Sequence, residues 1–120
     1  MRNHHLLPVL LMATCLSQTA FAQINPFRGS VGTPLTAADI AALTDATNRL
    51  LDRPVLNVGD TETWSNPQSG GSGSVAAGSA EQRNGLACRV VLYQHTVPGP
   101  DPQRSATLTW CKTKDGWKIG

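Results

Sequence analysis

One stretch of this sequence has the periodicity of a helix, and everything after it has the pattern of strands. In residues 36–52, apolar and small side chains recur every three or four positions, at Ile40, Leu43, Ala46, Thr47, Leu50 and Leu51. Beyond Pro54, apolar and polar residues alternate in runs that Gly, Pro, Asn and Asp interrupt. This pattern predicts an α+β fold in which one N-terminal helix packs on a four- to five-stranded antiparallel meander sheet. One helix covers only one face of a sheet, so we expect the other face to be polar or to bind something.

The predicted helix has clear signals at both ends. Thr36 is a favoured N-cap residue, and Asp39 three positions later completes a capping box. Leu35 and Ile40 occupy the positions of a hydrophobic staple, and Pro54 ends the helix. The side away from the core is expected to carry the polar residues Asp39, Asp45, Asn48, Arg49 and Asp52.

Five short segments have strand character, and turn signals separate them. The predicted strands are residues 58–64, 74–80, 86–97, 105–112 and 117–119. The turns contain Ser69–Gly73, Asn84-Gly85, Pro98–Pro102 and Asp115-Gly116. Asn-Gly and Asp-Gly are strong signals for a hairpin, which indicates that neighbouring strands pair in sequence order.

The first 22 residues have the parts of a secretory signal peptide. A short basic start precedes an apolar run at 6–16, and Ala20-Phe21-Ala22 offers a cleavage site before Gln23. The apolar run of about 11 residues is too short to span a bilayer, so we expect no transmembrane segment in the mature chain. Residues 23–35 are predicted to be a flexible leader and 36–120 the folded domain. Lipidation of Cys15 is an alternative, although the residues before it match that signal poorly.

Removal of residues 1–22 leaves two cysteines, Cys88 and Cys111. An even number of cysteines in an exported chain indicates a disulfide. Pleating raises a difficulty, because Cys88 shares its side of the strand with Leu92, whereas Cys111 and Trp110 fall on opposite sides. If Leu92 and Trp110 both face the helix, the two sulfur atoms lie on opposite faces of the sheet. Either a β-bulge near Trp110 reconciles them, or the inner face of the third strand is formed by Val91 and Tyr93.

Short motifs occur in a fixed order from Trp64 to the end of the chain. They are Trp64-Ser65-Asn66-Pro67, Ser69-Gly70, Gly73 with Val75, Cys88-Arg89, Trp110-Cys111-Lys112 and Asp115-Gly116-Trp117. In this order they resemble the C-terminal domain of bacterial outer-membrane surface antigens, the Gram-negative family typified by the rickettsial 17 kDa surface antigen. The family pattern runs W-x-N-P-x-S-G, G-x-V, C-R and C-R-x-x-D-G-x-W, and Lys112 stands where Arg is usual. Many members carry a glycine zipper before this domain, and this chain has none.

The resemblance implies an exported cell-envelope protein of the periplasm, the outer membrane or the cell surface. In such a protein the exposed sheet face or a strand edge would contact an envelope protein or peptidoglycan. The resemblance brings no catalytic, cofactor-binding or metal-binding residue. We expect structural roles for the motif residues: strand exit at Asn66 and Pro67, backbone freedom or close approach at glycines such as Gly70 and Gly73, a turn at Asp115-Gly116, and burial of Trp64, Trp110 and Trp117. A groove lined by one or more of the tryptophans is the alternative.

Few residues suggest catalysis. A net charge of +2 gives no electrostatic case for nucleic acid. The chain has no phosphate loop, no nucleophile elbow and no C-x-x-C pair, and His95 is its only histidine after residue 22. We expect His95, Asp60 and Glu62 to face solvent. The sequence therefore predicts a non-enzymatic exported interaction or structural domain without a cofactor. The alternatives are a small periplasmic ligand-binding or inhibitor module that uses the Gly-rich and Pro-rich loops, and a hydrolase that uses Asp60, Glu62 or His95.

Overall fold

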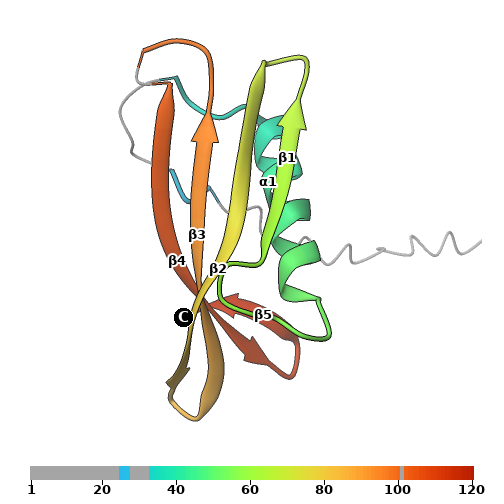
Figure 1. Ribbon diagram of the computed structural model, residues 1–120, viewed down its shortest axis with the longest axis vertical. Helices are drawn as coiled ribbons and strands as arrows, with labels where there is room; N and C mark the ends of the chain where they lie inside the picture. The colour runs from blue at the N-terminus through green and yellow to red at the C-terminus, as the bar shows by residue number, and fades with distance from the viewer. Residues whose placement is uncertain (1–24, 28–32, 101) are drawn as a thin grey trace, which may run out of the picture.

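The predicted α+β fold is present: one helix packs on a five-stranded antiparallel sheet (Figure 1). The computed structural model describes residues 25–27, 33–100 and 102–120, so the predicted signal peptide and Cys15 lie outside the described residues. The strands neighbour one another in sequence order, as expected for a meander. The elements are α1 (Ala37–Leu51), β1 (Thr61–Asn66), β2 (Gly71–Arg83), β3 (Leu86–Thr96), β4 (Gln103–Thr113) and β5 (Gly116–Ile119).

Helix α1 starts at the predicted capping box. The Thr36 hydroxyl accepts a hydrogen bond from the Asp39 amide at 3.1 Å, and the Asp39 carboxylate accepts one from the Thr36 amide at 2.9 Å. The predicted apolar stripe faces the sheet, where its buried members are Leu43, Ala46, Thr47, Leu50 and Leu51. Asp39 was expected on the solvent side and is instead fully buried. The cause is the β1–β2 turn, which folds over the first turn of the helix.

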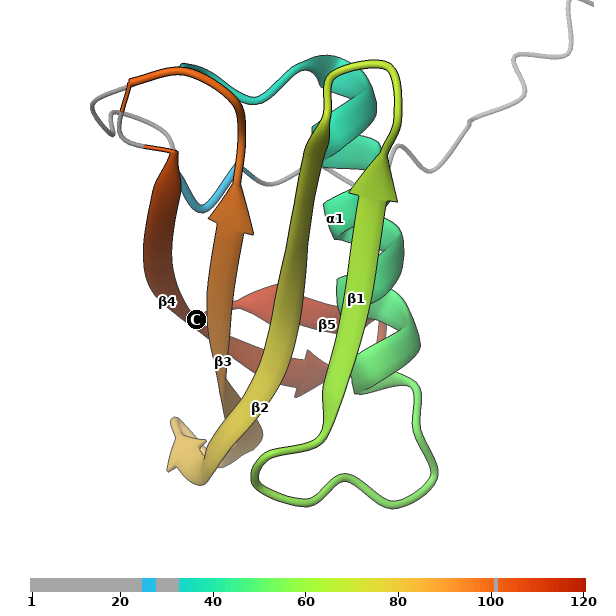
Figure 2. The ribbon, with the colours of Figure 1, turned by 45° about the horizontal axis from the view of Figure 1, so that its top comes forward.

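The sheet is built from long hairpins and curls along its length (Figure 2). Asn84 and Gly85 form the β2–β3 turn with positive φ angles of 50° and 77°, as their sequence predicts. A register shift between Ala77 and Ala80 marks a β-bulge in β2, and bulges increase local twist. The β4–β5 hairpin is thereby carried toward the C-terminal end of α1 (Figures 1 and 2). β2 is longer than predicted at both ends, because Gly71–Gly73 and Glu81–Arg83 also belong to the strand.

The core lies between α1 and one face of the sheet, which we call the inner face. It gathers Leu43, Leu50, Trp64, Val75, Val91, Tyr93 and Trp110. Phe27 and Leu35 also belong to this core, with exposed fractions of 4% and 8%. Both lie in the segment predicted to be a flexible leader, and both are packed parts of the domain.

The disulfide between Cys88 and Cys111 is present, and the register explains how it forms. The two residues are direct partners on β3 and β4, with Cα atoms 4.0 Å apart. Directly opposed residues of an antiparallel pair project to the same side. Val91 and Tyr93 form the inner face of β3, whereas Leu92 points outward and is 44% exposed. Of the two ways to reconcile the cysteines, the second is correct, and β3 and β4 pair without a bulge between Cys88 and Thr96.

Candidate functional site

The face of the sheet opposite α1, here the outer face, carries a hollow of about 630 Å³ that crosses four strands. The register places Thr63, Ser74, Gln94 and Ser105 in one cross-strand row. The next row contains Ser72, Thr96 and Gln103. We call these seven side chains and the backbone between the rows the outer hollow.

Chemically, the outer hollow is neutral and rich in hydrogen-bonding groups. Its outward side chains are hydroxyls and carboxamides, each of which both donates and accepts. None of the seven carries a charge. An apolar spot adjoins them, because the following row brings together Ala76 and the exposed Leu92. Such a surface suits a polar, uncharged partner surface with a small apolar contact.

Directly behind the hollow, the middle row of residues points inward. Trp64, Gly73, His95 and Arg104 are register partners on the four strands. A Cβ atom at Gly73 would lie 2.5 Å from Trp64 Nε1, so glycine is required for the indole to lie across β2. Trp64 is 6% exposed, which confirms that it is a core residue.

The structure places His95 differently from the sequence-based expectation. It is 2% exposed, and the edge of the Phe27 ring meets its ring with centroids 3.9 Å apart. Neither imidazole nitrogen has a hydrogen-bond partner among the described residues. Burial lowers the pKa of His95, the nearby Arg104 lowers it further, and Asp39 opposes the shift only in part. The imidazole is therefore neutral at physiological pH and is packed as a core aromatic ring.

Two loops meet at the end of the sheet above the hollow. In the β1–β2 turn, Gly70 has a φ of 74°, and a Cβ atom there would lie 3.1 Å from Pro98 Cγ in the β3–β4 loop. The Gly-rich and Pro-rich loops therefore cluster, which is the arrangement that a loop-based binding module needs. The two loops lie at the same end of the sheet (Figures 1 and 2).

Asp39 anchors the β1–β2 turn to the helix. Its Oδ1 accepts hydrogen bonds from Asn66 Nδ2 at 2.8 Å and Ser69 Oγ at 2.6 Å. Burial acts to raise the pKa of Asp39, but the hydrogen bonds from Ser69, Thr36 and Asn66 together lower it below its ordinary value. Asn66 and Pro67 thus end β1 as predicted, and Asn66 has the additional role of holding a buried carboxylate.

The remaining motif residues lie at the other end of the sheet. Arg89 donates to Gly78 O at 3.0 Å and to Leu56 O at 3.1 Å, so it bridges the bulge in β2 and the loop before β1. Trp110 is buried and donates from Nε1 to Tyr93 Oη at 3.0 Å. Trp117 is only partly buried against the core. The turn before β5 includes Asp115, and Gly116 follows it with a φ of 108°.

The three residues proposed for a hydrolase do not share a site. Asp60 and Glu62 both pair with Arg53, at 3.6 and 3.0 Å, and Glu62 also pairs with Arg49. Hydrogen bonds from Arg53, against a smaller effect of desolvation, lower the pKa of Glu62. His95 lies in the core, with its ring nitrogens covered. In the described part of the chain, no three His, Cys, Asp or Glu residues form a metal-binding group.

Sequence reasoning missed two features of the site. Tyr93 links three elements, since its hydroxyl also hydrogen-bonds with Thr47 Oγ1 of α1 at 3.2 Å. Arg49 and Arg53 donate to the carbonyls of Thr63 and Thr61 on β1. Arg49 was expected on the polar side of the helix, but no local signal indicated that the partners of Arg49 and Arg53 are backbone groups of a strand.

No helix in residues 25–27, 33–100 or 102–120 has the length and apolarity that crossing a membrane requires. Comparisons of the chain with protein-family models, with curated proteins and with solved structures each found no match. The functional argument therefore depends on the residues and their geometry.

Proposed function

We propose that this chain is a non-enzymatic, exported protein of the bacterial cell envelope that binds another envelope component through the outer hollow. The observation that carries the proposal is the asymmetry of the sheet. The inner face is covered by α1 and by Phe27 and Leu35, whereas no described residue covers the outer face at the hollow. A neutral lattice of hydroxyl and amide groups provides many weak hydrogen bonds and little penalty for desolvating charge.

Two further features support the envelope setting. The predicted signal peptide at residues 1–22 directs export. The Cys88–Cys111 disulfide suits an oxidising compartment such as the periplasm. The resemblance to outer-membrane surface antigens adds the expectation that the partner is an envelope protein or peptidoglycan.

A small periplasmic ligand-binding or inhibitor module is the second candidate. The contact of Gly70 with Pro98 favours it, because it brings the two irregular loops to one end of the domain. In that case the loop cluster, and not the outer hollow, makes the principal contact with the partner.

Site-specific photo-crosslinking tests the proposal in a Gram-negative host that expresses the full chain. A photoreactive amino acid at Gln94 probes the centre of the outer hollow, one at Gln68 probes the β1–β2 turn, and one at Asp45 probes the exposed side of α1. The proposal expects crosslinks to an envelope protein or to peptidoglycan fragments from Gln94 and none from Asp45. Ser74→Arg, which places a charge in the hollow, should abolish the Gln94 crosslink without changing the melting temperature.

Each contrary outcome has a definite meaning. Crosslinks from Gln68 alone would favour the loop-based module. Crosslinks from neither position, or equal crosslinks from Asp45, would contradict binding through the hollow. Non-reduced mass spectrometry of the same material tests export: we expect Gln23–Gly120 less two hydrogen atoms. A chain beginning at an acylated Cys15 would establish the lipoprotein alternative, and an uncleaved cytoplasmic chain would contradict export.

A further inference from the structure

A second pocket, of about 400 Å³, lies on the inner side of the sheet just beyond the end of α1. We call it the basal pocket. Its lining runs from buried to exposed residues: Leu51, at the floor, is 4% exposed, whereas Lys112, at the rim, is exposed to solvent. The apolar part of the lining includes Leu51, Leu56 and the partly buried Trp117. A pocket of this size that combines apolar and polar walls has the dimensions of a small-molecule site.

The charge in the basal pocket is unbalanced. Arg53 is neutralised by Asp60 and Glu62. Arg89 and Lys112 also line the pocket, and no carboxylate pairs with either one in the described part of the chain. Arg89 is held in place by two main-chain carbonyls, which orient its guanidinium but do not compensate its charge.

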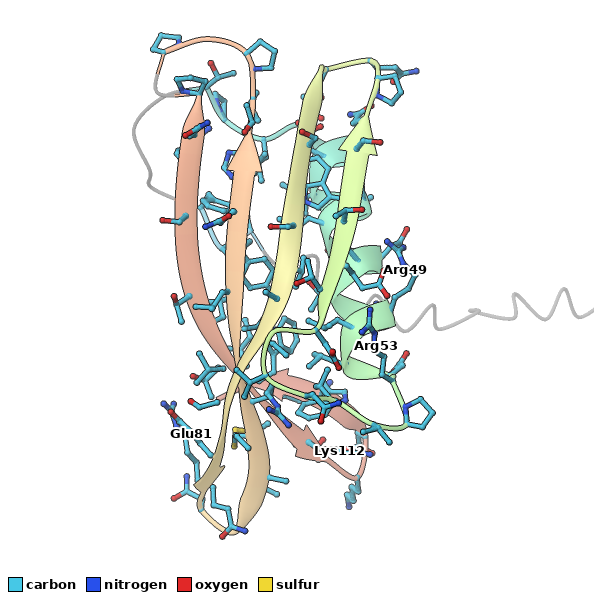
Figure 3. The ribbon with its side chains drawn as sticks, in the orientation of Figure 1. Arg49, Arg53, Glu81 and Lys112 are labelled. Atoms are coloured by element: carbon cyan, nitrogen blue, oxygen red, sulfur yellow. A yellow bond between two sulfur atoms is a disulfide. The ribbon has the colours of Figure 1, made fainter. Side chains whose placement is uncertain are left out.

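The one acidic residue of the lining does not supply the missing charge. Glu81 is the register partner of Cys88, so it projects to the opposite side of the sheet from Arg89. Its carboxylate pairs with Arg83 at 3.2 Å. Figure 3 shows Glu81 on the other side of the twisted β2–β3 end from Lys112, and Arg53 on the helix side. Two positive charges therefore adjoin an apolar floor without an anion between them.

We propose that the basal pocket binds a small amphiphilic carboxylate, an acid with a medium-length acyl chain or an aryl group. The carboxylate would lie between Arg89 and Lys112, where charge-assisted hydrogen bonds are available. The apolar part would contact Leu51 and Leu56 and cover the indole of Trp117. This site is independent of the outer hollow, because it lies on the inner side of the sheet at its other end.

Binding of octanoate to the full chain tests the inference, with 1-octanol as the neutral probe of equal length and inorganic phosphate as the anion without an apolar part. We expect one octanoate per chain by calorimetry, and a shift of the Trp117 indole N–H signal in NMR spectra without a shift of the Trp110 signal. Octanol should bind about tenfold more weakly, because its neutral hydroxyl cannot form an ion pair with Arg89 or Lys112. Phosphate should bind more weakly still.

A pair of lysine variants locates the charge. Lys112→Glu should weaken octanoate binding about fivefold, as expected for an exposed charge at a rim. Lys118→Glu is the matched control, because Lys118 is exposed on the same hairpin but pairs in register with Cys111 and so projects to the other side. Both variants should have the melting temperature of the wild-type protein, since neither lysine makes a hydrogen bond or ion pair in the described structure. Any of four results would overturn the inference. These are octanol binding as tightly as octanoate, phosphate binding as tightly as octanoate, equal weakening of octanoate binding by the two lysine variants, and a shift by octanoate of only the signals of other tryptophans.

Discussion

Ser69 Oγ lies 2.6 Å from Oδ1 of Asp39, a contact that joins the first turn of the helix to a turn 30 residues away. The same carboxylate closes the capping box with Thr36 and accepts a hydrogen bond from Asn66. One buried side chain therefore sets both the start of α1 and the position of the β1–β2 turn. The β1–β2 turn is one of the two loops that meet above the outer hollow, so a contact made on the inner side helps to position this end of the outer face.

Asp39→Asn should destabilise the domain by about 2 kcal/mol, because hydrogen bonds to a buried charged group contribute more than those to a neutral one. The amide also offers donors where Ser69 and Asn66 already donate. Chemical denaturation of the variant and the wild type measures the difference. Asp45→Asn is the control, since Asp45 is an exposed helical aspartate. Equal unfolding midpoints for Asp39→Asn and Asp45→Asn would contradict the anchoring role.

Stability should fall in mild acid because of His95. Its folded pKa lies below the ordinary value of 6.5, so the unfolded chain binds a proton in a pH range in which the folded chain does not. The contribution of neutral His95 to the free energy of unfolding is fully present above pH 6.5. It is lost as the pH falls below that value toward the pKa of His95 in the folded protein. The lowered pKa of Asp39 acts in the same direction in a more acidic range, below its ordinary value of 3.8.

Thermal melts of residues 23–120 between pH 7.5 and 5 measure this effect, and His95→Gln is the matched variant that does not titrate. We expect the wild-type melting temperature to decline below pH 6.5 and that of His95→Gln to be nearly flat over the same range. His95 is the only histidine in this part of the chain, so no other imidazole contributes. A parallel decline in both proteins would contradict the assignment.

Tyr93→Phe should destabilise the domain by about 1–3 kcal/mol, because it leaves the buried Nε1–H of Trp110 without its acceptor. Thr47 loses a partner in the same variant, but its hydroxyl retains the bond to Leu43 O. The double variant Tyr93→Phe with Trp110→Phe removes donor and acceptor together. The two changes should be less than additive in denaturant unfolding. Strict additivity would contradict a coupling between the two side chains.

Much of this fold follows from local sequence patterns, and the exceptions have a common cause. The helix, its capping box and the Asn84-Gly85 hairpin depend on residues a few positions apart, and all three are correctly predicted. The burial of Asp39 and His95 was missed because it depends on distant segments. The β1–β2 turn covers Asp39, and Phe27 packs on His95. The hydrophobic pattern of one helix or strand does not predict which of its residues a distant loop will cover.

The side of the strand on which each cysteine lies was also not predictable from one strand alone. Apolar residues occupy both sides of β3, so the sequence alone does not identify the inner side. The disulfide decides the matter once Trp110 is known to face inward: Cys111 then faces outward, its register partner Cys88 does the same, and Tyr93 is left on the inner side. The outer hollow was anticipated only in the expectation that the uncovered face of the sheet is polar or binds something. Which residues line the outer hollow depends on the register of four paired strands, and the sequence of one strand does not determine that register.

Replacement of both Cys88 and Cys111 by Ser should lower stability by about 3 kcal/mol under oxidising conditions, given a closed loop of 23 residues. Both residues are buried, although on the outer side of the sheet, so the variant also places hydroxyls at buried positions. Comparing the wild type with and without reductant separates the effect of the bond from that of the substitution. A wild-type protein that melts at the same temperature in reductant would show that the disulfide does not stabilise the fold.

Arg49 and Arg53 should protect the open edge of the sheet. Because Ala77 N donates to Asp60 O, alternate residues of β1 bond to β2, and the carbonyls of Thr61 and Thr63 point to the free edge. The two guanidinium groups occupy these carbonyls at 3.0 Å each, and both arginines lie beside β1 in Figure 3. Unpaired strand edges are templates for association, and charged side chains are a common protection against it.

The double variant Arg49→Gln with Arg53→Gln should therefore self-associate at concentrations at which the wild type is monodisperse. Light scattering measures this, and Arg83→Gln is the control because Arg83 is exposed and pairs only with Glu81 in the described structure. Loss of the ion pairs to Glu62 should cost little stability, since ion pairs at a protein surface are screened by solvent and contribute little. Association without a comparable loss of stability would assign the arginines to edge protection. A variant that is less stable but remains monomeric would show instead that their main role is to hold α1 on the sheet.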